Sequence, residues 1–267
     1  MPRFSANLST LFGETPFLGR FAAAAQCGFT AVEYQFPYAF DRRDLAAAQR
    51  ELRLPVVLHN APPGDMDKGE RGLGCLAGRQ AEFRDQITLA IDYARAVNCK
   101  KLHVMAGIWP PGAAEEDLDR VFVENLRHAG KEAAKVGIEI LIEPLSRPAV
   151  PNYYLCKSKQ AARIIEQARV PNLKLQYDFF HMQVMEGNLA ATVERRLPII
   201  GHIQMADAPK RLEPGTGEIN YPFLFAHLDR IGYQGHVGAE YKPERPTAET
   251  LAWFQPYRAA QKKALTT

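Results

Sequence analysis

The sequence predicts an α/β protein that forms one closed (β/α)₈ barrel, the architecture known as the TIM barrel. Short apolar runs alternate with segments of helical spacing along the whole chain, and such alternation is typical of a parallel sheet. The length of 267 residues suits one barrel domain spanning 1–267, and an apolar content of 46% allows a large core. The first turn, residues 5–13, has no glycine-rich pattern, which disfavours a doubly wound nucleotide-binding sheet.

Eight apolar runs are predicted strands, taken in chain order: Arg3–Leu8, Ala31–Gln35, Val56–Asn60, Lys101–Met105, Ile138–Glu143, Leu173–Asp178, Ile199–Gln204 and His236–Tyr241. Between the third and fourth runs, apolar residues recur at steps of three and four, which predicts a helix: Phe83, Ile87, Ala90, Ile91 and Ala94. The same spacing predicts a helix between the fourth and fifth runs: Leu118, Val121, Phe122, Leu126, Ala129 and Ala133.

The glycines and loops between these predicted elements support the same alternation of strands and helices. Gly28 and Gly137 each follow a predicted helix and precede a strand, where positive φ is often required. The two longest loops, 61–78 and 205–219, leave the carboxyl ends of the third and seventh strands, the rim on which barrel active sites are built. The last residues, 259–267, are expected to form a fraying tail.

Composition excludes several classes of protein. With 33 basic and 30 acidic side chains the net charge is only +3, so a protein that coats nucleic acid is disfavoured. The four cysteines are widely spaced and indicate neither a zinc knuckle nor a disulfide framework. The amino-terminal sequence resembles no signal peptide, and no apolar run has the length of a membrane span. We therefore expect a soluble cytoplasmic protein; a homo-oligomer is compatible with the sequence.

Polar residues end four consecutive predicted strands. Glu143, Asp178, Gln204 and Glu240 are separated by 35, 26 and 36 residues, gaps that a helix-containing crossover fills. An acidic residue at a strand end is usually a helix cap or the start of a loop. Four oxygen-bearing residues at successive ends instead predict a cluster with no cation of its own, which needs a metal ion. Carboxylate and amide oxygens suit Mg²⁺ or Mn²⁺.

Other polar residues near this rim are candidates for substrate binding, although each has an ordinary structural explanation as well. His59 ends the third strand, and His181 lies three residues after Asp178. Arg71, in the glycine-rich third loop, could hold a carboxylate in a bidentate manner. Arg211 and Lys242 add positive charge that suits an anionic substrate. Glu33, near the end of the second strand, could line the pocket but fits a satisfied core group somewhat better, and His103 is expected to be interior packing with a hydrogen bond.

The chain resembles the hydroxypyruvate isomerase family of the xylose-isomerase-like barrels. Several segments between residue 3 and about residue 258 carry the resemblance: Arg3-Phe-Ser-Ala-Asn-Leu-Ser9, Phe12-Gly-Glu14, Ala25-Gln-Cys-Gly-Phe29, Gly69-Glu-Arg-Gly72, Ile142-Glu-Pro144, Gln176-Tyr-Asp178, His181-Met-Gln183, Pro214-Gly-Thr-Gly-Glu-Ile-Asn-Tyr221 and Glu240-Tyr-Lys-Pro243. The joint pattern is specific, although each segment alone is a modest signal.

The resemblance implies a metal-dependent isomerase acting on a small anionic hydroxy-oxo acid. It implies that Glu143 and Glu240 are the acid/base residues and that both, with Asp178 and Gln204, hold the metal. Many relatives carry histidine at the position of Gln204, and glutamine fits this family. Two subgroups share the motifs: one interconverts hydroxypyruvate and 2-hydroxy-3-oxopropanoate, and the other isomerises 2-oxo-tetronates to 3-oxo-tetronates. Nothing in the sequence separates them.

Other functions use the same fold. A ketose 3-epimerase for neutral sugars would need more hydroxyl-binding groups and less positive charge near the site. A DNA-repair endonuclease would need a histidine-rich multi-zinc site and a basic groove. A barrel that binds a metal or an acid without catalysis is the remaining alternative.

Overall fold

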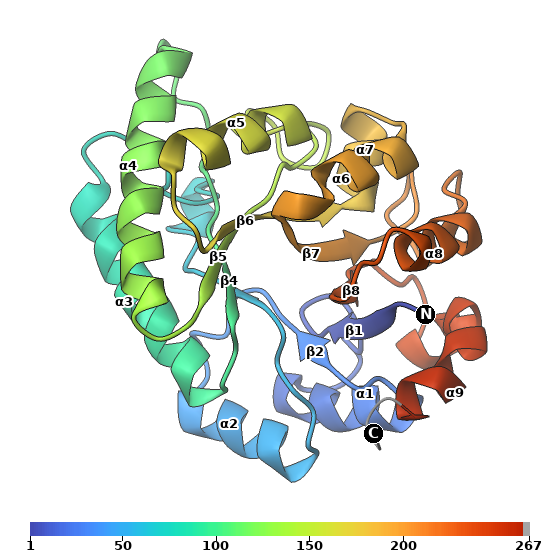
Figure 1. Ribbon diagram of the computed structural model, residues 1–267. Coiled ribbons are helices and arrows are strands. Elements are labelled where there is room, and N and C mark those ends of the chain that lie inside the picture. Colours follow the sequence, from blue (N-terminus) through green and yellow to red (C-terminus); the bar gives the residue numbers. More distant parts are fainter. Residues whose placement is uncertain (264–267) are drawn as a thin grey trace.

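The computed structural model describes residues 1–263 and shows a barrel of eight parallel strands surrounded by helices (Figure 1). The neighbouring strands run in the order β2-β1-β8-β7-β6-β5-β4-β3. A bridge between Val32 and Val56, and a hydrogen bond from Asn60 N to Gln35 O, join β2 to the chain at β3 and so close the barrel. The strands are β1 Arg3–Asn7, β2 Val32–Glu33, β3 His59–Asn60, β4 Lys101–His103, β5 Glu139–Ile142, β6 Leu173–Asp178, β7 Ile200–Met205 and β8 His236–Ala239.

Helices fill the connections between successive strands, as βαβ units require. They are α1 Arg20–Cys27, α2 Arg42–Glu51, α3 Gln80–Ala96, α4 Glu115–Ala134, α5 Ser158–Ala168, α6 Phe179–Met185, α7 Leu189–Arg196, α8 Tyr221–Arg230 and α9 Gln255–Lys263. Gly28 ends α1 with φ 95°, and Gly137 precedes β5 with φ 68°. Both glycines therefore have the positive φ that their positions predicted.

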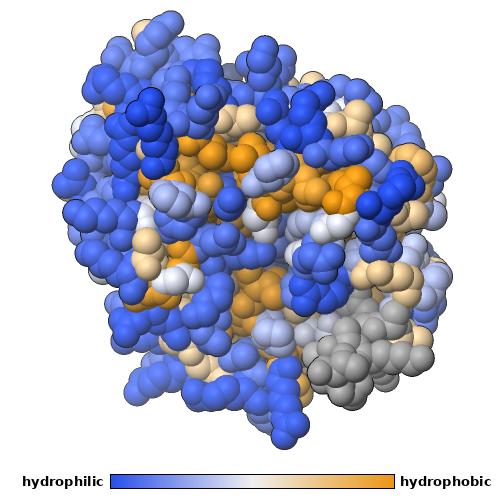
Figure 2. Space-filling view, viewed as in Figure 1, coloured by the Kyte–Doolittle hydropathy of each residue, from blue (hydrophilic) through white to orange (hydrophobic). Residues whose placement is uncertain are grey.

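The apolar core lies between the barrel wall and the helices. In α3 and α4 the predicted apolar residues are all buried, so the helical spacing was interpreted correctly. Polar side chains cover most of the face shown in Figure 2, and apolar side chains are visible mainly inside this polar rim. No helix within residues 1–263 has both the length and the hydrophobicity that crossing a membrane requires.

The predicted barrel is confirmed, and the differences concern the ends of elements. Strand β3 contains only two residues, because residues 55–58 bond to the β2 segment in an irregular ladder. The tail predicted for 259–267 begins inside α9, which continues to Lys263; residues 264–267 lie outside the described part of the chain. The long loops after β3 and β7 are present where they were predicted, and both lie on the carboxyl rim of the barrel.

Candidate active site

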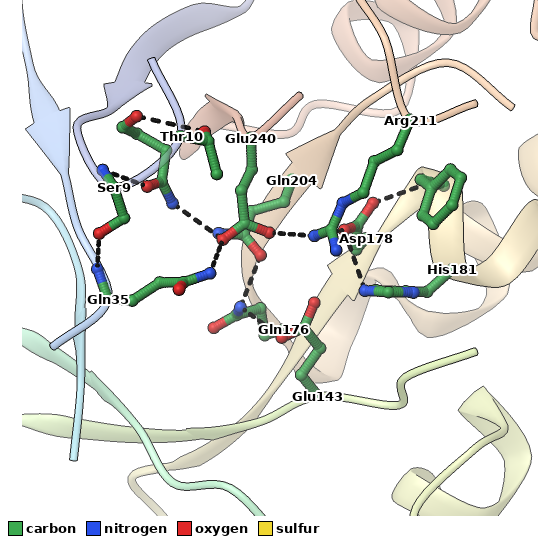
Figure 3. A network of polar contacts seen from close by, with 12 residues as sticks. Ser9, Thr10, Gln35, Glu143, Gln176, Asp178, His181, Gln204, Arg211 and Glu240 are labelled. Carbon is green, nitrogen blue, oxygen red and sulfur yellow. Dashed lines mark hydrogen bonds and ion pairs between the residues drawn. The ribbon is translucent and has the colours of Figure 1, made fainter. Parts of the chain in front are cut away.

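Side chains from the carboxyl ends of β5 to β8 converge at one end of the barrel (Figure 3). Glu143 follows β5, Asp178 ends β6, Gln204 lies near the end of β7 and Glu240 follows β8. All four are buried, with exposed fractions between 0% and 4%. The structure thus brings together the four residues that the spacing of the strand ends singled out.

A cavity of about 140 Å³ opens above this cluster. Five of the predicted site residues line it: Arg71, Glu143, His181, Arg211 and Glu240. Loop residues form part of its wall, among them Met66 and Arg71 of the long loop after β3. The Arg71 guanidinium donates hydrogen bonds to the backbone oxygens of Met66 and Glu70, which hold it on the loop at the cavity wall.

The expectation that the cluster contains no cation of its own is wrong. The Arg211 guanidinium lies 2.6 Å from Glu240 Oε2 and 3.6 Å from Asp178 Oδ2, and Figure 3 shows it between the two carboxylates. It also lies over the Phe180 ring, 5.3 Å from the centroid, in a cation–π arrangement. The sequence did not reveal this contact because Arg211 reaches the cluster through the fold of a loop.

That loop, between β7 and α8, is held by a buried carboxylate. Asp207 accepts hydrogen bonds from the backbone N–H groups of Gly215, Thr216, Gly217 and Ile219, at 2.8 to 3.1 Å. A Cβ at Gly217 would lie 1.9 Å from the carbonyl oxygen of Ala208, so only glycine permits this approach. Asp207 O also accepts from the Arg211 N–H, which fixes the arginine backbone beside the cluster.

The two carboxylate oxygens of Asp178 have different surroundings. Its Oδ1 accepts a hydrogen bond of 2.7 Å from Phe180 N and so caps α6. Its Oδ2 is buried, has no hydrogen-bond partner among residues 1–263, and faces the cluster. Burial and the nearby Glu240 raise the pKa of Asp178 to about 7, although Arg211 opposes the increase. One oxygen therefore caps the helix, and the other faces the cluster without a hydrogen bond, with Arg211 at 3.6 Å.

The two glutamates have different surroundings. Glu240 accepts hydrogen bonds from Asn7, Gln35 and Arg211, at 3.0, 2.9 and 2.6 Å. Glu143 accepts one, of 3.0 Å, from Gln176, and its Oε1 has no partner in the described chain. Burial raises the pKa of both carboxyls, and the charge of Glu240 raises that of Glu143 further. Glu240 thus has far more support for its charged form than Glu143 has.

A chain of hydrogen bonds inside the barrel fixes the direction of two amides. Gln204 Nε2 donates to Glu33 Oε1 at 2.7 Å, and Gln204 Oε1 accepts from Gln176 Nε2 at 2.6 Å. A carboxylate only accepts hydrogen bonds, so Glu33 requires the Gln204 N–H to face it and turns the amide oxygen toward the cluster. A Cβ at Gly238 would lie 2.3 Å from both Glu33 oxygens, so the glycine in β8 leaves the space that Glu33 occupies.

Glu33 is the satisfied core group that we expected. Its carboxylate is fully buried and accepts from Ser5, Asn7, His202 and Gln204, at 2.7, 3.3, 2.9 and 2.7 Å. Burial alone would raise its pKa, but the charge and hydrogen bond of His202, with the bonds from Gln204 and Ser5, leave it below the usual value.

Replacing Glu33 with alanine is expected to lower the free energy of unfolding by about 3–5 kcal/mol, because several buried donors would lose their acceptor. Urea denaturation followed by circular dichroism measures this change. Glu124→Ala, on the exposed side of α4, is the control and should stay within about 0.5 kcal/mol of the wild type. A loss below 1 kcal/mol for Glu33→Ala would show that the network contributes little.

His181 is positioned to donate a hydrogen bond into the site. The Ser146 backbone N–H donates to His181 Nδ1 at 3.1 Å, so the proton of the neutral ring is on Nε2. Nε2 lies 3.7 Å from Asp178 Oδ2. Burial, with the charge of Arg211, lowers the pKa of His181 well below its ordinary value, which keeps the ring neutral.

Two predicted binding residues do not line the cavity. His59 is fully buried, and its Nε2 lies 3.3 Å from the Ala90 carbonyl oxygen of α3, on the outer side of the barrel. Because strand side chains alternate, the neighbouring Asn60 faces the cavity instead. Lys242 follows β8 and is exposed. Its backbone N–H donates to Arg211 O, and its charge contributes to lowering the pKa of His181, so Lys242 acts on the site by charge rather than as part of the cavity wall.

Sequence reasoning missed several residues of the site. Gln35, Asn60 and His103 line the cavity, and Gln176 joins Glu143 to Gln204. Gln176 could have been predicted, because it lies two residues before Asp178 in the same strand and so shares its face. His103 was expected to be packed with a hydrogen bond, but neither of its ring nitrogens has a partner among the described residues. Burial lowers the pKa of His103 to about 3.

Comparison with known proteins agrees with this architecture. The family model described as xylose isomerase-like TIM barrel matches residues 21–257. Hydroxypyruvate isomerase of Escherichia coli (strain K12) is 48% identical over 97% of this chain and 100% of its own. The 2-oxo-tetronate isomerase of Pectobacterium atrosepticum is 45% identical over 96% of this chain and 98% of its own. A crystal structure described as AP endonuclease, family 2, from Brucella melitensis superposes with a TM-score of 0.95, at 44% identity over 97% of this chain and 100% of that one.

Fold and site together define a xylose isomerase-like TIM barrel with an acidic centre at its carboxyl rim. Within that class, the chain belongs to the family of hydroxypyruvate and 2-oxo-tetronate isomerases, and it is an isomerase.

Proposed function

We propose that the protein is a metal-dependent isomerase that moves a carbonyl group between adjacent carbons of a small hydroxy-oxo acid. The observation that carries the proposal is a small cavity with three buried carboxyls beneath it and two arginines in its wall. The carboxyls suit a metal and proton transfer, and the arginines suit an acid. The relatives named for hydroxypyruvate and 2-oxo-tetronate support substrates of three or four carbons.

Glu143, Asp178, Gln204 and Glu240 would hold the metal ion. Ligand atoms of Glu143, Asp178 and His181 lie within 4.8 Å of one another, and one oxygen each of Glu143 and Asp178 is buried without a partner in the described chain. Oxygen donors of this kind suit Mg²⁺ or Mn²⁺. When bound, the metal supplies a Lewis acid that stabilises negative charge on the substrate oxygens.

The two glutamates transfer the proton. One ionised carboxylate removes the proton from the hydroxyl-bearing carbon, which gives an enediolate, and the other glutamate, in its protonated form, gives a proton to the neighbouring carbon. Proton exchange with solvent then restores both carboxyls for the next turnover. The hydroxyl proton passes to the former carbonyl oxygen, so the product is an isomer of the substrate. Two carboxyls share these tasks when their surroundings differ. We assign Glu240, which accepts three hydrogen bonds, as the base and Glu143, which accepts one, as the acid.

Arg71 and His181 bind and orient the substrate, and Arg211 holds Glu240 in place beside it. Arg71 reaches the cavity from the loop after β3, and His181 offers its Nε2–H from α6. Arg211 is already paired with Glu240, so Arg71 is the cation free to hold the substrate carboxylate.

Arg71→Ala is expected to raise KM for hydroxypyruvate about tenfold or more with little change in kcat, because a charged hydrogen bond contributes roughly 1.5–3 kcal/mol. Steady-state kinetics at saturating metal measures both constants. Lys68→Ala, an exposed lysine in the same loop, is the control and should leave KM unchanged. An unchanged KM in Arg71→Ala would mean that this loop is not the carboxylate clamp.

One assay panel tests the proposed function. Metal-stripped protein, restored with Mg²⁺ or Mn²⁺, is offered hydroxypyruvate, 2-oxo-tetronates and neutral ketoses. Turnover of either acid only after metal is restored supports the proposal. Turnover of ketoses alone would indicate an epimerase. Acid binding without turnover would indicate a binding protein.

A histidine-rich multi-zinc centre, which a DNA-repair endonuclease would need, is not present within residues 1–263. The metal-capable group of Glu143, Asp178 and His181 contains one histidine.

A further inference from the structure

His103 is the buried histidine that the site described so far does not use. It ends β4, is 1% exposed, and lines the cavity with Glu143 and His181. Its Nδ1 lies 3.8 Å from Glu143 Oε2, beyond hydrogen-bond distance, and neither ring nitrogen has a partner within the described residues. Buried polar groups are nearly always hydrogen-bonded, so an exception in a cavity wall needs an explanation.

The other buried histidines in this fold have hydrogen-bond partners within the protein. His59 and His227 each bond to a backbone carbonyl, at 3.3 and 3.0 Å. His202 bonds to Glu33 at 2.9 Å, and His181 accepts from Ser146. Each of these rings has at least one paired nitrogen, although Nδ1 of His59 and of His202 has no partner, whereas neither nitrogen of His103 is paired within the described residues. The Nδ1 of His103 lies 3.8 Å from the glutamate that we assign as the acid.

We propose that His103 is a substrate-binding residue that donates a hydrogen bond from its ring to an oxygen of the bound hydroxy-oxo acid next to Glu143. The inference rests on the proposed function, because it takes the same cavity and the same acid. An imidazole has at least one N–H in every protonation state, so it can donate to a carbonyl, hydroxyl or carboxylate oxygen. Together with His181, it gives the cavity wall that contains Glu143 two imidazole donors.

Substitution of a residue that serves binding rather than stability should weaken substrate binding without lowering the stability of the protein. Replacing an unpaired buried polar group by an apolar one of similar size removes an unfavourable burial and leaves stability equal or higher. The same change removes the contact with the substrate. His103→Leu should therefore keep or raise the Tm of the protein and weaken substrate binding.

The experiment combines stability, binding and turnover. For His103→Leu we expect an unchanged or higher Tm, at least a tenfold lower kcat/KM for hydroxypyruvate with Mn²⁺, and unchanged Mn²⁺ affinity by calorimetry. His103→Gln, which keeps a donor, should recover part of kcat/KM. His227→Leu, which removes a histidine bonded outside the cavity, should lower Tm and leave kcat/KM unchanged.

Binding is measured separately from turnover, so that the two proposals fail in different ways. In the Glu143→Gln background, calorimetry with hydroxypyruvate and Mn²⁺ should give a Kd at least tenfold weaker when His103→Leu is added. An equal Kd, or a loss of Tm that accounts for the lost activity, would overturn the inference. Binding by the wild type without conversion would instead overturn the proposed isomerase activity.

Discussion

Glu240→Gln and Glu143→Gln are each expected to lower kcat by roughly 10²–10⁴-fold, the range that general acid–base catalysis supplies. Glutamine keeps the size of the side chain and one oxygen, so the barrel should remain folded. Both positions lie beneath the same cavity, and each carries one half of the proton transfer in the proposed mechanism. Initial rates on hydroxypyruvate with saturating Mn²⁺ measure the loss, and near-wild-type turnover in either variant would remove that residue from the mechanism.

The two variants should differ in deuterium oxide. If Glu240 is the base, Glu240→Gln loses exchange of the substrate C–H with solvent together with turnover. Glu143→Gln can still remove and return the proton at the first carbon, so exchange continues while product formation falls. Nuclear magnetic resonance of the recovered substrate distinguishes the cases. Exchange that persists only in Glu240→Gln would reverse the assignment, and full retention of the substrate hydrogen by the wild type would indicate a hydride shift.

Glu139→Gln is the matched control for these variants. Glu139 lies at the opposite end of β5, four residues before Glu143, and is half-buried. The same chemical change there should leave kcat unchanged, because the amino-terminal ends of barrel strands are remote from the cavity.

The sequence predicted the barrel because each strand and helix carries its own local signal. In α3 and α4 the three- and four-residue spacing identified the buried face residue by residue. The sequence also predicted that the polar residues at the carboxyl ends of β5, β6, β7 and β8 would meet, since parallel strands end on one rim. These predictions needed only the period of each element and the order of the elements along the chain.

Contacts that depend on the direction of a side chain or on the fold of a loop could not be predicted from the periodicity of the sequence. His59 and Asn60 are adjacent at the end of β3, and the structure was needed to show that Asn60 is the one facing the cavity. Arg211 enters the cluster because Asp207 binds four backbone N–H groups of its loop, an arrangement with no periodic signature. The unpaired state of His103 depends on what surrounds it, which the sequence does not specify.

Without metal, the protein is expected to lose stability as the pH rises from about 4 to about 7, because of Asp178. Burial raises the pKa of this carboxyl from 3.8 to about 7, so the folded state binds its proton more tightly than the unfolded state does. Below pH 4 both states are protonated and Asp178 has no effect. As the pH rises, the unfolded state ionises first and is favoured, and a pKa raised from 3.8 to about 7 costs roughly 4 kcal/mol above pH 7.

Asp178→Asn isolates this contribution. Asparagine keeps the oxygen that caps α6 and is an equally good cap, but it does not ionise. In metal-free protein, the difference in unfolding free energy between Asp178→Asn and the wild type should grow in favour of the variant between pH 4 and pH 7. Chemical denaturation at a series of pH values measures it. A difference that stays constant with pH would mean that Asp178 does not hold its proton in the folded protein.

Added Mn²⁺ should reverse the trend in the wild type alone. A metal displaces the protons from its carboxylate ligands, so its affinity rises with pH over the range in which metal-free protein loses stability. Metal bound at 100 times its Kd adds about 2.7 kcal/mol to the folded state. The wild type should therefore gain most from Mn²⁺ near pH 8, while Asp178→Asn gains far less. Equal stabilisation of both proteins would place the ion away from Asp178 and contradict the proposed ligand set.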